Sequence, residues 1–336
     1  MPRISLPPIL NLPRALRFRR LLSQRDPDLD YVFDFGAVGH TDPIGLLLVS
    51  DTISRFQSQQ CFGSSDCINH DHLGYQRTMG FFRAAGFSFG LAPGQAPGGP
   101  NYLPITHLEV DDLKLEAEER SLSVGTVIEE HANRMSQILA RQSDGDLCDA
   151  LTYALREVIR NVLEHSGFGQ VHFCAQHWPT KSRVHLALLD RGRGIRASLS
   201  RNPYLEMDSD LAALKLALMP GVSGRMYKGV RRNKHDIWQN TGYGLYMTSR
   251  LATFGGSFWL MSGDSALGIA SHWVRELSIL PFEGTVLRVS FDTAQLGKLA
   301  TRLSQFEREG REIARQFQGA DARGASHASK MIRTRF

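Results

Sequence analysis

Three polar residues recur at helical spacing in one segment of the chain. Glu157, Asn161 and Glu164 stand at positions i, i+4 and i+7, so a helix would place them on one face. A carboxylate and an amide one turn apart can serve a single site together. The neighbouring apolar stripe, which would bury this helix, consists of Leu151, Leu155, Val158 and Val162. We expect the helix to end at Gly167.

A second polar group follows a predicted pair of strands. Gln170–Trp178 and Arg183–Leu189 are predicted to form a hairpin, with alternate apolar residues of the second strand on one side. The second strand leads into Asp190, with glycines at positions 192 and 194. An acid at the end of a strand, followed by glycines, allows the backbone to approach a ligand closely.

Two further glycine motifs lie later in the chain. The full series is Glu157-x-x-x-Asn161, Asp190-x-Gly192-x-Gly194, Gly242-Tyr243-Gly244-Leu245 and Gly284-Thr285. This series resembles the four boxes of the GHKL ATPases, which include gyrase, heat-shock chaperones, histidine kinases, mismatch-repair ATPases and anti-sigma serine kinases. The resemblance covers roughly residues 126–292. It implies an α/β sandwich of the Bergerat type, with helices on one face of a mixed sheet.

The resemblance also implies roles for the motif residues in binding ATP and Mg²⁺. Asn161 would supply an oxygen ligand to Mg²⁺, and Glu157 would be the general base. Asp190 would accept a hydrogen bond from the adenine amino group. The other implied nucleotide contacts are Gly192, Gly194, Gly242, Tyr243, Gly244, Leu245 and Thr285. Without the resemblance, the same residues are also consistent with exposed helix positions, a turn acid and an ordinary strand threonine.

Some residues depart from the pattern of particular GHKL members and so indicate which members the motifs resemble most. Arg160 precedes Asn161 where gyrase-like members have Asp, and Tyr246 stands where sensor histidine kinases usually have Gly. His131 lacks the residues that normally follow a phosphoacceptor histidine, so we interpret it as a solvated helix residue. The motifs are therefore most similar to those of stand-alone regulators such as anti-sigma serine kinases.

The N-terminal third suggests a separate, smaller α/β domain. Residues 1–27 are rich in Pro and Arg and are expected to form a basic arm. A strand at Tyr31–Phe35, a turn with Asp42 and Pro43, and a helix at Leu46–Phe56 resemble a STAS domain. We assign residues 28–104 to this STAS-like domain and a Gly/Pro-rich linker. The cysteines and histidines at 61, 67, 70 and 72 match no usual zinc spacing, so we interpret them as chance polar residues.

The second half completes the predicted ATPase domain, residues 105–292. Residues 195–241 would form its lid over the nucleotide, including the predicted helix Leu211–Leu218. Another helix is expected at Leu245–Phe254, and strands at Ser257–Met261, Ile269–Leu277 and Gly284–Phe291. Residues 293–336 are predicted to be a basic helix and tail, packed on the same domain or on a second subunit, with nucleic-acid binding as the weaker alternative.

Composition limits the functional class only broadly. The chain has 336 residues, a formal net charge of +5 and four cysteines without a disulfide framework. No apolar run approaches the roughly 20 residues of a membrane span. We therefore expect a cytoplasmic protein with an unidentified protein partner, a possible homodimer, and no membrane partner. The predicted function is Mg-ATP binding with hydrolysis or Ser/Thr phosphorylation of a partner. The alternatives are a nucleotide-sensing module without turnover and a nucleic-acid-associated ATPase.

Overall fold

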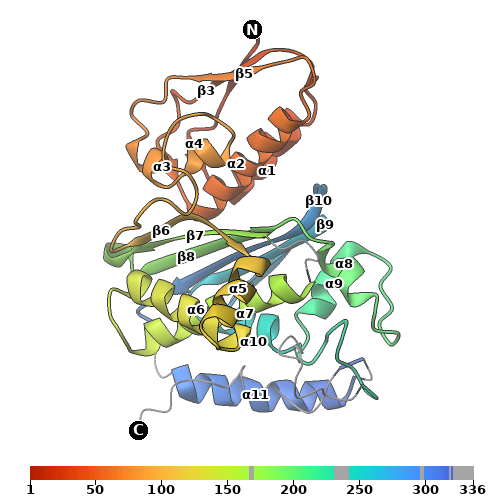
Figure 1. Cartoon of the computed structure of the whole chain (residues 1–336). Helices are drawn as coiled ribbons and strands as arrows, with labels where there is room; N and C mark the ends of the chain where they lie inside the picture. The colour runs from red at the N-terminus through yellow and green to blue at the C-terminus, as the bar shows by residue number, and fades with distance from the viewer. Residues whose placement is uncertain (166–169, 231–241, 296–298, 318, 321–336) are drawn as a thin grey trace. The chain divides into compact units, whose positions relative to one another are not determined.

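The computed structural model describes residues 1–165, 170–230, 242–295, 299–317 and 319–320 (Figure 1). Its elements are helices with parallel and antiparallel sheets, so the α/β class is confirmed. The chain divides into two compact units. Unit 1 contains residues 1–107 with 172–176 and 185–189, and unit 2 contains the remainder. Within the described ranges, every helix is too short or too polar to traverse a lipid bilayer.

Unit 1 contains a small parallel sheet and several helices. Its sheet order is β1-β3-β5, and a separate parallel pair joins β2 to β4. Asp42 caps α2 as expected, because its Oδ1 accepts a hydrogen bond from the Gly45 backbone N–H at 2.8 Å, and Pro43 begins the helix. The elements are β1 (Arg3–Ser5), β2 (Ile9–Leu10), α1 (Leu12–Leu22), β3 (Tyr31–Asp34), β4 (His40–Thr41), α2 (Pro43–Ser58), β5 (Ser65–Ile68), α3 (Gly74–Thr78) and α4 (Phe81–Ala84).

The predicted N-terminal arm is wrong, because residues 1–27 belong to the core of unit 1. Strand β1 pairs with β3, and α1 packs against α2. The apolar residues between the arginines of α1 are the reason: at helical spacing they form one buried stripe, while the arginines occupy the other faces. The buried residues of α1 are Leu12, Ala15, Phe18 and Leu22.

A substitution on α1 distinguishes a core helix from an arm. Phe18→Leu should lower the free energy of unfolding by about 1 to 2 kcal/mol, because Phe18 is buried and the smaller side chain leaves part of its site empty. The neighbouring Arg17→Ala is the control, since Arg17 is exposed and should change stability by less than about 0.5 kcal/mol. Urea denaturation of both variants measures the difference. Equal midpoints would support a detached arm.

The predicted boundary between linker and second domain falls inside a strand. Strand β6 (Tyr102–Glu109) begins within the predicted linker and crosses position 104, and unit 1 ends at His107. Unit 1 also includes the central residues of β7 and β8. Two of its internal hydrogen bonds show this: Cys174 Sγ donates to the Pro43 carbonyl at 3.2 Å, and Tyr75 Oη donates to Gln176 Oε1 at 2.8 Å.

The larger sheet has five strands in the order β6-β7-β8-β10-β9. Strands β7 (Gln170–Trp178) and β8 (Arg183–Asp190) lie where the hairpin was predicted. The three strands expected after residue 256 are instead two long antiparallel strands, β9 (Ser257–Ala270) and β10 (Trp273–Asp292). The predicted strand Ile269–Leu277 spans their turn. The pairing of β10 with β9 shifts its register near Phe282. Strand β10 therefore continues through residues 278–283, which the sequence prediction left between two strands.

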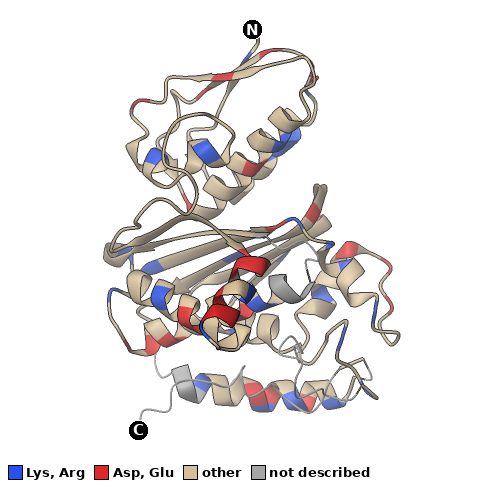
Figure 2. Ribbon diagram, viewed as in Figure 1, with Lys and Arg blue, Asp and Glu red and all other residues tan. Residues whose placement is uncertain are grey.

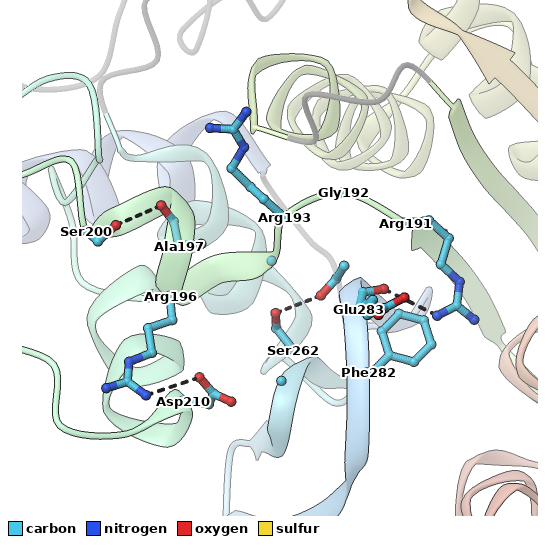
Figure 3. Close-up of a pocket in the computed structure, with 13 residues that line it drawn as sticks. Arg191, Gly192, Arg193, Arg196, Ala197, Ser200, Asp210, Ser262, Phe282 and Glu283 are labelled. Carbon is cyan, nitrogen blue, oxygen red and sulfur yellow. Dashed lines mark hydrogen bonds and ion pairs between the residues drawn. The ribbon is translucent and has the colours of Figure 1, made fainter. Parts of the chain in front are cut away.

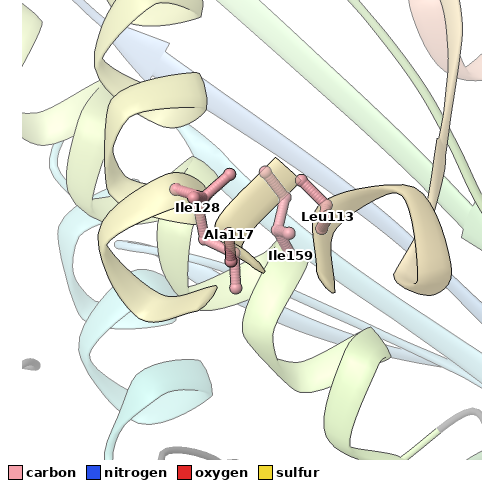
Figure 4. Close-up of a cluster of buried hydrophobic side chains, with 5 residues drawn as sticks. Leu113, Ala117, Ile128 and Ile159 are labelled. Carbon is pink, nitrogen blue, oxygen red and sulfur yellow. The ribbon is translucent and has the colours of Figure 1, made fainter. Parts of the chain in front are cut away.

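Helices α5, α6, α7 and α10 lie along one face of this sheet (Figure 1). A buried cluster joins α5, α6 and α7 (Figure 4); its members are Leu113, Ala117, Val127, Ile128 and Ile159. Leu151 and Leu155 of the predicted stripe are buried. The side chains of Val158, Val162 and Glu164, and the expected helix end at Gly167, lie outside the described structure. The helices are α5 (Val110–Glu119), α6 (Val124–Ala140), α7 (Asp146–His165), α8 (Gly194–Leu199), α9 (Asp210–Ala217) and α10 (Gly244–Ala252).

The C-terminal helix α11 (Leu299–Arg315) packs on unit 2 itself. The Phe306 and Phe254 rings lie 5.7 Å apart, and Arg250 pairs with Glu309 at 3.0 Å. Acidic and basic residues are interspersed along this helix (Figure 2). This packing is one of the two placements predicted for the helix, which were its own domain and a second subunit. The tail beyond residue 320 and the lid residues 231–241 lie outside the described residues.

Candidate functional site

Two motifs that are far apart in the sequence meet at Glu157. The Glu157 side chain, on α7, is fully buried. Gly244 is the first residue of α10, and a Cβ added to it would lie 2.3 Å from Glu157 Oε2. No side chain fits at position 244 while the carboxylate keeps this place. The first and third motifs are therefore in direct contact, as a shared site requires.

Two arginines that flank Glu157 in the helix compensate its buried charge. Arg156 Nη2 lies 3.1 Å from Glu157 Oε1, and Arg160 Nη1 lies 3.6 Å from the same atom. Both arginines are themselves buried. A buried carboxylate is tolerated when it is paired in this way, and breaking the pair is costly. Sequence reasoning missed Arg156 and noted Arg160 only as a departure from the family pattern. Glu157 and Asn161, which were expected to share one helix face, differ in burial, because Glu157 is buried and Asn161 is partly exposed.

The close approach at Gly244 leads to a testable prediction. Gly244→Ala should lower the free energy of unfolding by about 1 to 3 kcal/mol, because its methyl group displaces a carboxylate that two arginines hold in place. A double-mutant cycle with Glu157→Ala is the check, since removing the carboxylate also removes the clash. Thermal denaturation should show that Gly244→Ala costs clearly less in the Glu157→Ala background. Additive effects would mean that the two residues do not touch.

Asp190 ends strand β8 and is buried beside Thr285 of β10. Its Oδ1 accepts a hydrogen bond from the Gly192 backbone N–H at 2.7 Å. Burial raises the pKa of Asp190 to about 6, while hydrogen bonds from Gly192 and Thr285 act in the opposite direction. The carboxyl group is thus mainly ionised at pH 7 and accepts hydrogen bonds. The structure brings together Asp190, Gly192 and Thr285, as the sequence motifs predicted.

Ser262 of β9 links the loop that contains Gly192 and Gly194 to Gly284 of β10 by hydrogen bonds. Its Oγ donates to the Gly284 carbonyl at 2.7 Å and accepts from the Ile195 N–H at 3.0 Å. Gly194 and Gly284 both have positive φ, +76° and +99°, and a Cβ at Gly284 would lie 2.1 Å from the Asp190 carbonyl oxygen. Only glycine fits these two positions. Ser262 carries no motif signal in the sequence and was missed.

A cavity of about 610 Å³ adjoins this loop (Figure 3). The glycines 192, 194 and 284 line it, together with three arginines that point in different directions. Arg191 lies over the Phe282 ring at 4.1 Å, and Arg196 donates to the Met207 carbonyl at 3.0 Å. The Arg193 side chain is exposed and makes no hydrogen bond or ion pair with any described residue. Arg193 is therefore the cation of this cavity that remains available to an anionic ligand.

The remaining motif residues, Gly242, Tyr243 and Leu245, lie at the start of α10. The Gly242 carbonyl accepts from the Gly221 N–H at 3.2 Å. Tyr243 is fully buried, and a Cβ at Gly310 of α11 would lie 3.2 Å from its ring. Any contact of Tyr243 with a ligand must therefore come from its backbone, because its side chain packs between helices. Leu245 is partly exposed.

The two histidines of the zinc-like cluster, His70 and His72, have other partners in the structure. His70 stacks on Phe89 with ring centroids 4.4 Å apart, and the His72 Nε2 atom bonds with the Val38 carbonyl at 2.9 Å. Among the described residues, no three His, Cys, Asp or Glu side chains gather in a way that could hold a metal ion.

Comparison of the chain with family models, with curated proteins and with solved structures gave no match.

Proposed function

We propose that this protein binds Mg-ATP at the site formed by the four motifs, and that the bound nucleotide switches its interaction with a protein partner. The observation that supports this best is the buried Asp190 carboxylate, held by Gly192 and Thr285 beside a glycine-lined cavity. A fixed acceptor in a water-poor site recognises a donor group. The adenine amino group is such a donor, whereas guanine has a carbonyl oxygen at the same ring position.

The residues present fit a magnesium nucleotide. Gly192, Gly194 and Gly284 line the cavity, so that backbone atoms without side chains would face a planar base there. The backbone N–H groups at the start of α10 offer hydrogen-bond donors to phosphate oxygens, and the helix dipole favours their negative charge. The Asn161 side-chain oxygen is the ligand that α7 offers to Mg²⁺, with phosphates and water completing the shell. The bound Mg²⁺ would neutralise phosphate charge.

We further propose that Glu157 orients a water molecule or a substrate hydroxyl, giving hydrolysis or transfer to Ser/Thr of a partner. A second candidate function is nucleotide sensing without turnover. The observation that favours it is the complete burial of Glu157 and its pairing with Arg156 and Arg160, which leave the carboxylate without access to bulk water. The interspersed charges of α11 do not favour a nucleic-acid surface.

Calorimetric titration tests the binding proposal directly. We expect Mg-ATP to bind, GTP to bind at least tenfold more weakly, and EDTA to weaken ATP binding. Arg193→Gln should weaken ATP binding by severalfold, whereas Arg191→Gln should change it little, because Arg191 is already engaged with Phe282. Equal binding of ATP and GTP would contradict the role of Asp190. Phosphate release, measured with and without candidate partners, then separates an enzyme from a sensor.

A further inference from the structure

Unit 1 contains a cavity of its own, separate from the four motifs. Its volume is about 290 Å³, and all of its lining residues belong to unit 1. Helices α2 and α4 form one side of it, and residues of β6, β7 and β8 form the other. Leu47, Ile105 and Leu189 give it apolar walls. No motif in the sequence indicates this cavity, because its lining comes from two helices, three strands and the loop with Pro93.

The polar side chains of this cavity are those of two histidines, two serines, Asp51 and Arg83. His107 and His172 project from neighbouring strands, with ring centroids 4.1 Å apart and planes inclined by 55°. Each imidazole offers at least one N–H group. Arg83, on α4, adds an exposed guanidinium that makes no hydrogen bond or ion pair with any described residue. Asp51 is the one carboxylate in the lining, and Arg83 is the one lining side chain that is always cationic.

Size and chemistry together define the ligand. A cavity at the lower end of the range for ligand pockets accommodates roughly ten to fifteen non-hydrogen atoms. The apolar walls suit an aromatic or branched aliphatic body. The planar guanidinium of Arg83 matches a carboxylate through two parallel hydrogen bonds. The nearby Asp51 carboxylate disfavours a doubly charged phosphate.

We propose that this cavity of unit 1 binds a small monocarboxylate with an apolar body, and that Arg83 is its anchor. Such a site would give the protein a small-molecule ligand besides the nucleotide. It is independent of the proposed function, because none of the four motifs lines it.

Ligand-detected NMR and calorimetry on the full chain, without nucleotide, test this proposal. The probes are benzoate, phenylacetate and 4-methylpentanoate, each compared with its neutral amide. We expect at least one acid to bind and its amide to bind at least tenfold more weakly. Arg83→Gln should weaken the acid by about tenfold or more, because it removes the charged fork, and Arg83→Lys should give an intermediate loss.

The matched control is Arg17→Gln, which makes the same change on the exposed face of α1, away from the cavity. It should leave acid binding unchanged. Circular dichroism confirms that each variant is folded, which is expected because Arg83 and Arg17 are exposed. Failure of every acid to bind, equal binding of an acid and its amide, or unchanged affinity in Arg83→Gln would each overturn the proposal. These measurements contain no ATP, so they fail or succeed separately from the nucleotide proposal.

Discussion

Replacing Asp190 with asparagine should weaken Mg-ATP binding by about 2 to 4 kcal/mol, or roughly 30- to 1,000-fold. The change keeps the shape of the side chain, but its amide can present a donor where adenine also presents one. A hydrogen bond is lost and two donors face each other in a buried place. Calorimetric titration measures the effect. The control is Asp112→Asn, which makes the same change at an exposed position of α5.

The same variant should not destabilise the free protein at pH 7. The pKa of Asp190 in the folded protein is about 6, above its ordinary value of 3.8, so burial penalises the ionised form. This penalty is fully present above pH 6, declines as the pH falls, and disappears below about 3.8. Asparagine removes the penalty, so the melting temperature of the ATP-free variant should equal or exceed that of the wild type at pH 7. A large loss of stability would show that Asp190 is chiefly structural.

The pH dependence of ATP affinity is an independent test of the Asp190 carboxylate. As the pH falls below 6, Asp190 takes up a proton, loses its negative charge and presents an O–H donor in place of one of its two acceptor oxygens. The ATP affinity of the wild type should therefore decline between pH 7 and 5 more steeply than that of Asp190→Asn. The comparison with the variant cancels the titration of the phosphates. Parallel pH profiles would argue against a contact between Asp190 and the base.

Glu157→Gln should reduce turnover by about 10² or more while Mg-ATP affinity changes by only a few fold. The change preserves size and removes the base. It also leaves Arg156 and Arg160 buried without a carboxylate, so we expect a loss of about 3 kcal/mol in the free energy of unfolding. Phosphate release and ATP binding must therefore be measured at a temperature where both proteins are folded.

Two further variants make the Glu157 result specific. Glu118→Gln, at an exposed position of α5, should change neither turnover nor stability. Asn161→Ala should lower the Mg-dependent part of ATP affinity, because it removes the proposed metal ligand. Wild-type turnover in Glu157→Gln would show that this glutamate acts only through its ion pairs. No turnover of the wild type, even with its partner, would favour the nucleotide-sensing module.

The local elements were largely predictable from the sequence, because each depends on neighbours in the chain. The cap of α2 follows from Asp42 and Pro43, and the β7–β8 pair follows from alternation. The four motifs were recognised as glycines and acids at fixed spacing. Two of the expected proximities, Asp190 with Thr285 and α7 with the start of α10, are present in the structure. The binding of ATP at these residues stays a prediction.

Features that depend on burial between distant segments of the chain were decided only by the tertiary structure. Local composition marked residues 1–27 as an arm, yet their apolar stripe packs against α2. The charge balance around Glu157 exists because its carboxylate is buried, and the contact with Gly244 depends on how α10 packs on α7. The roles of Ser262, Gly310 and the His107–His172 pair come from strands and helices that the sequence leaves far apart. Helical and strand periodicity in the sequence indicate which face of a helix or strand is apolar. Which element packs against that face depends on the packing of the whole chain.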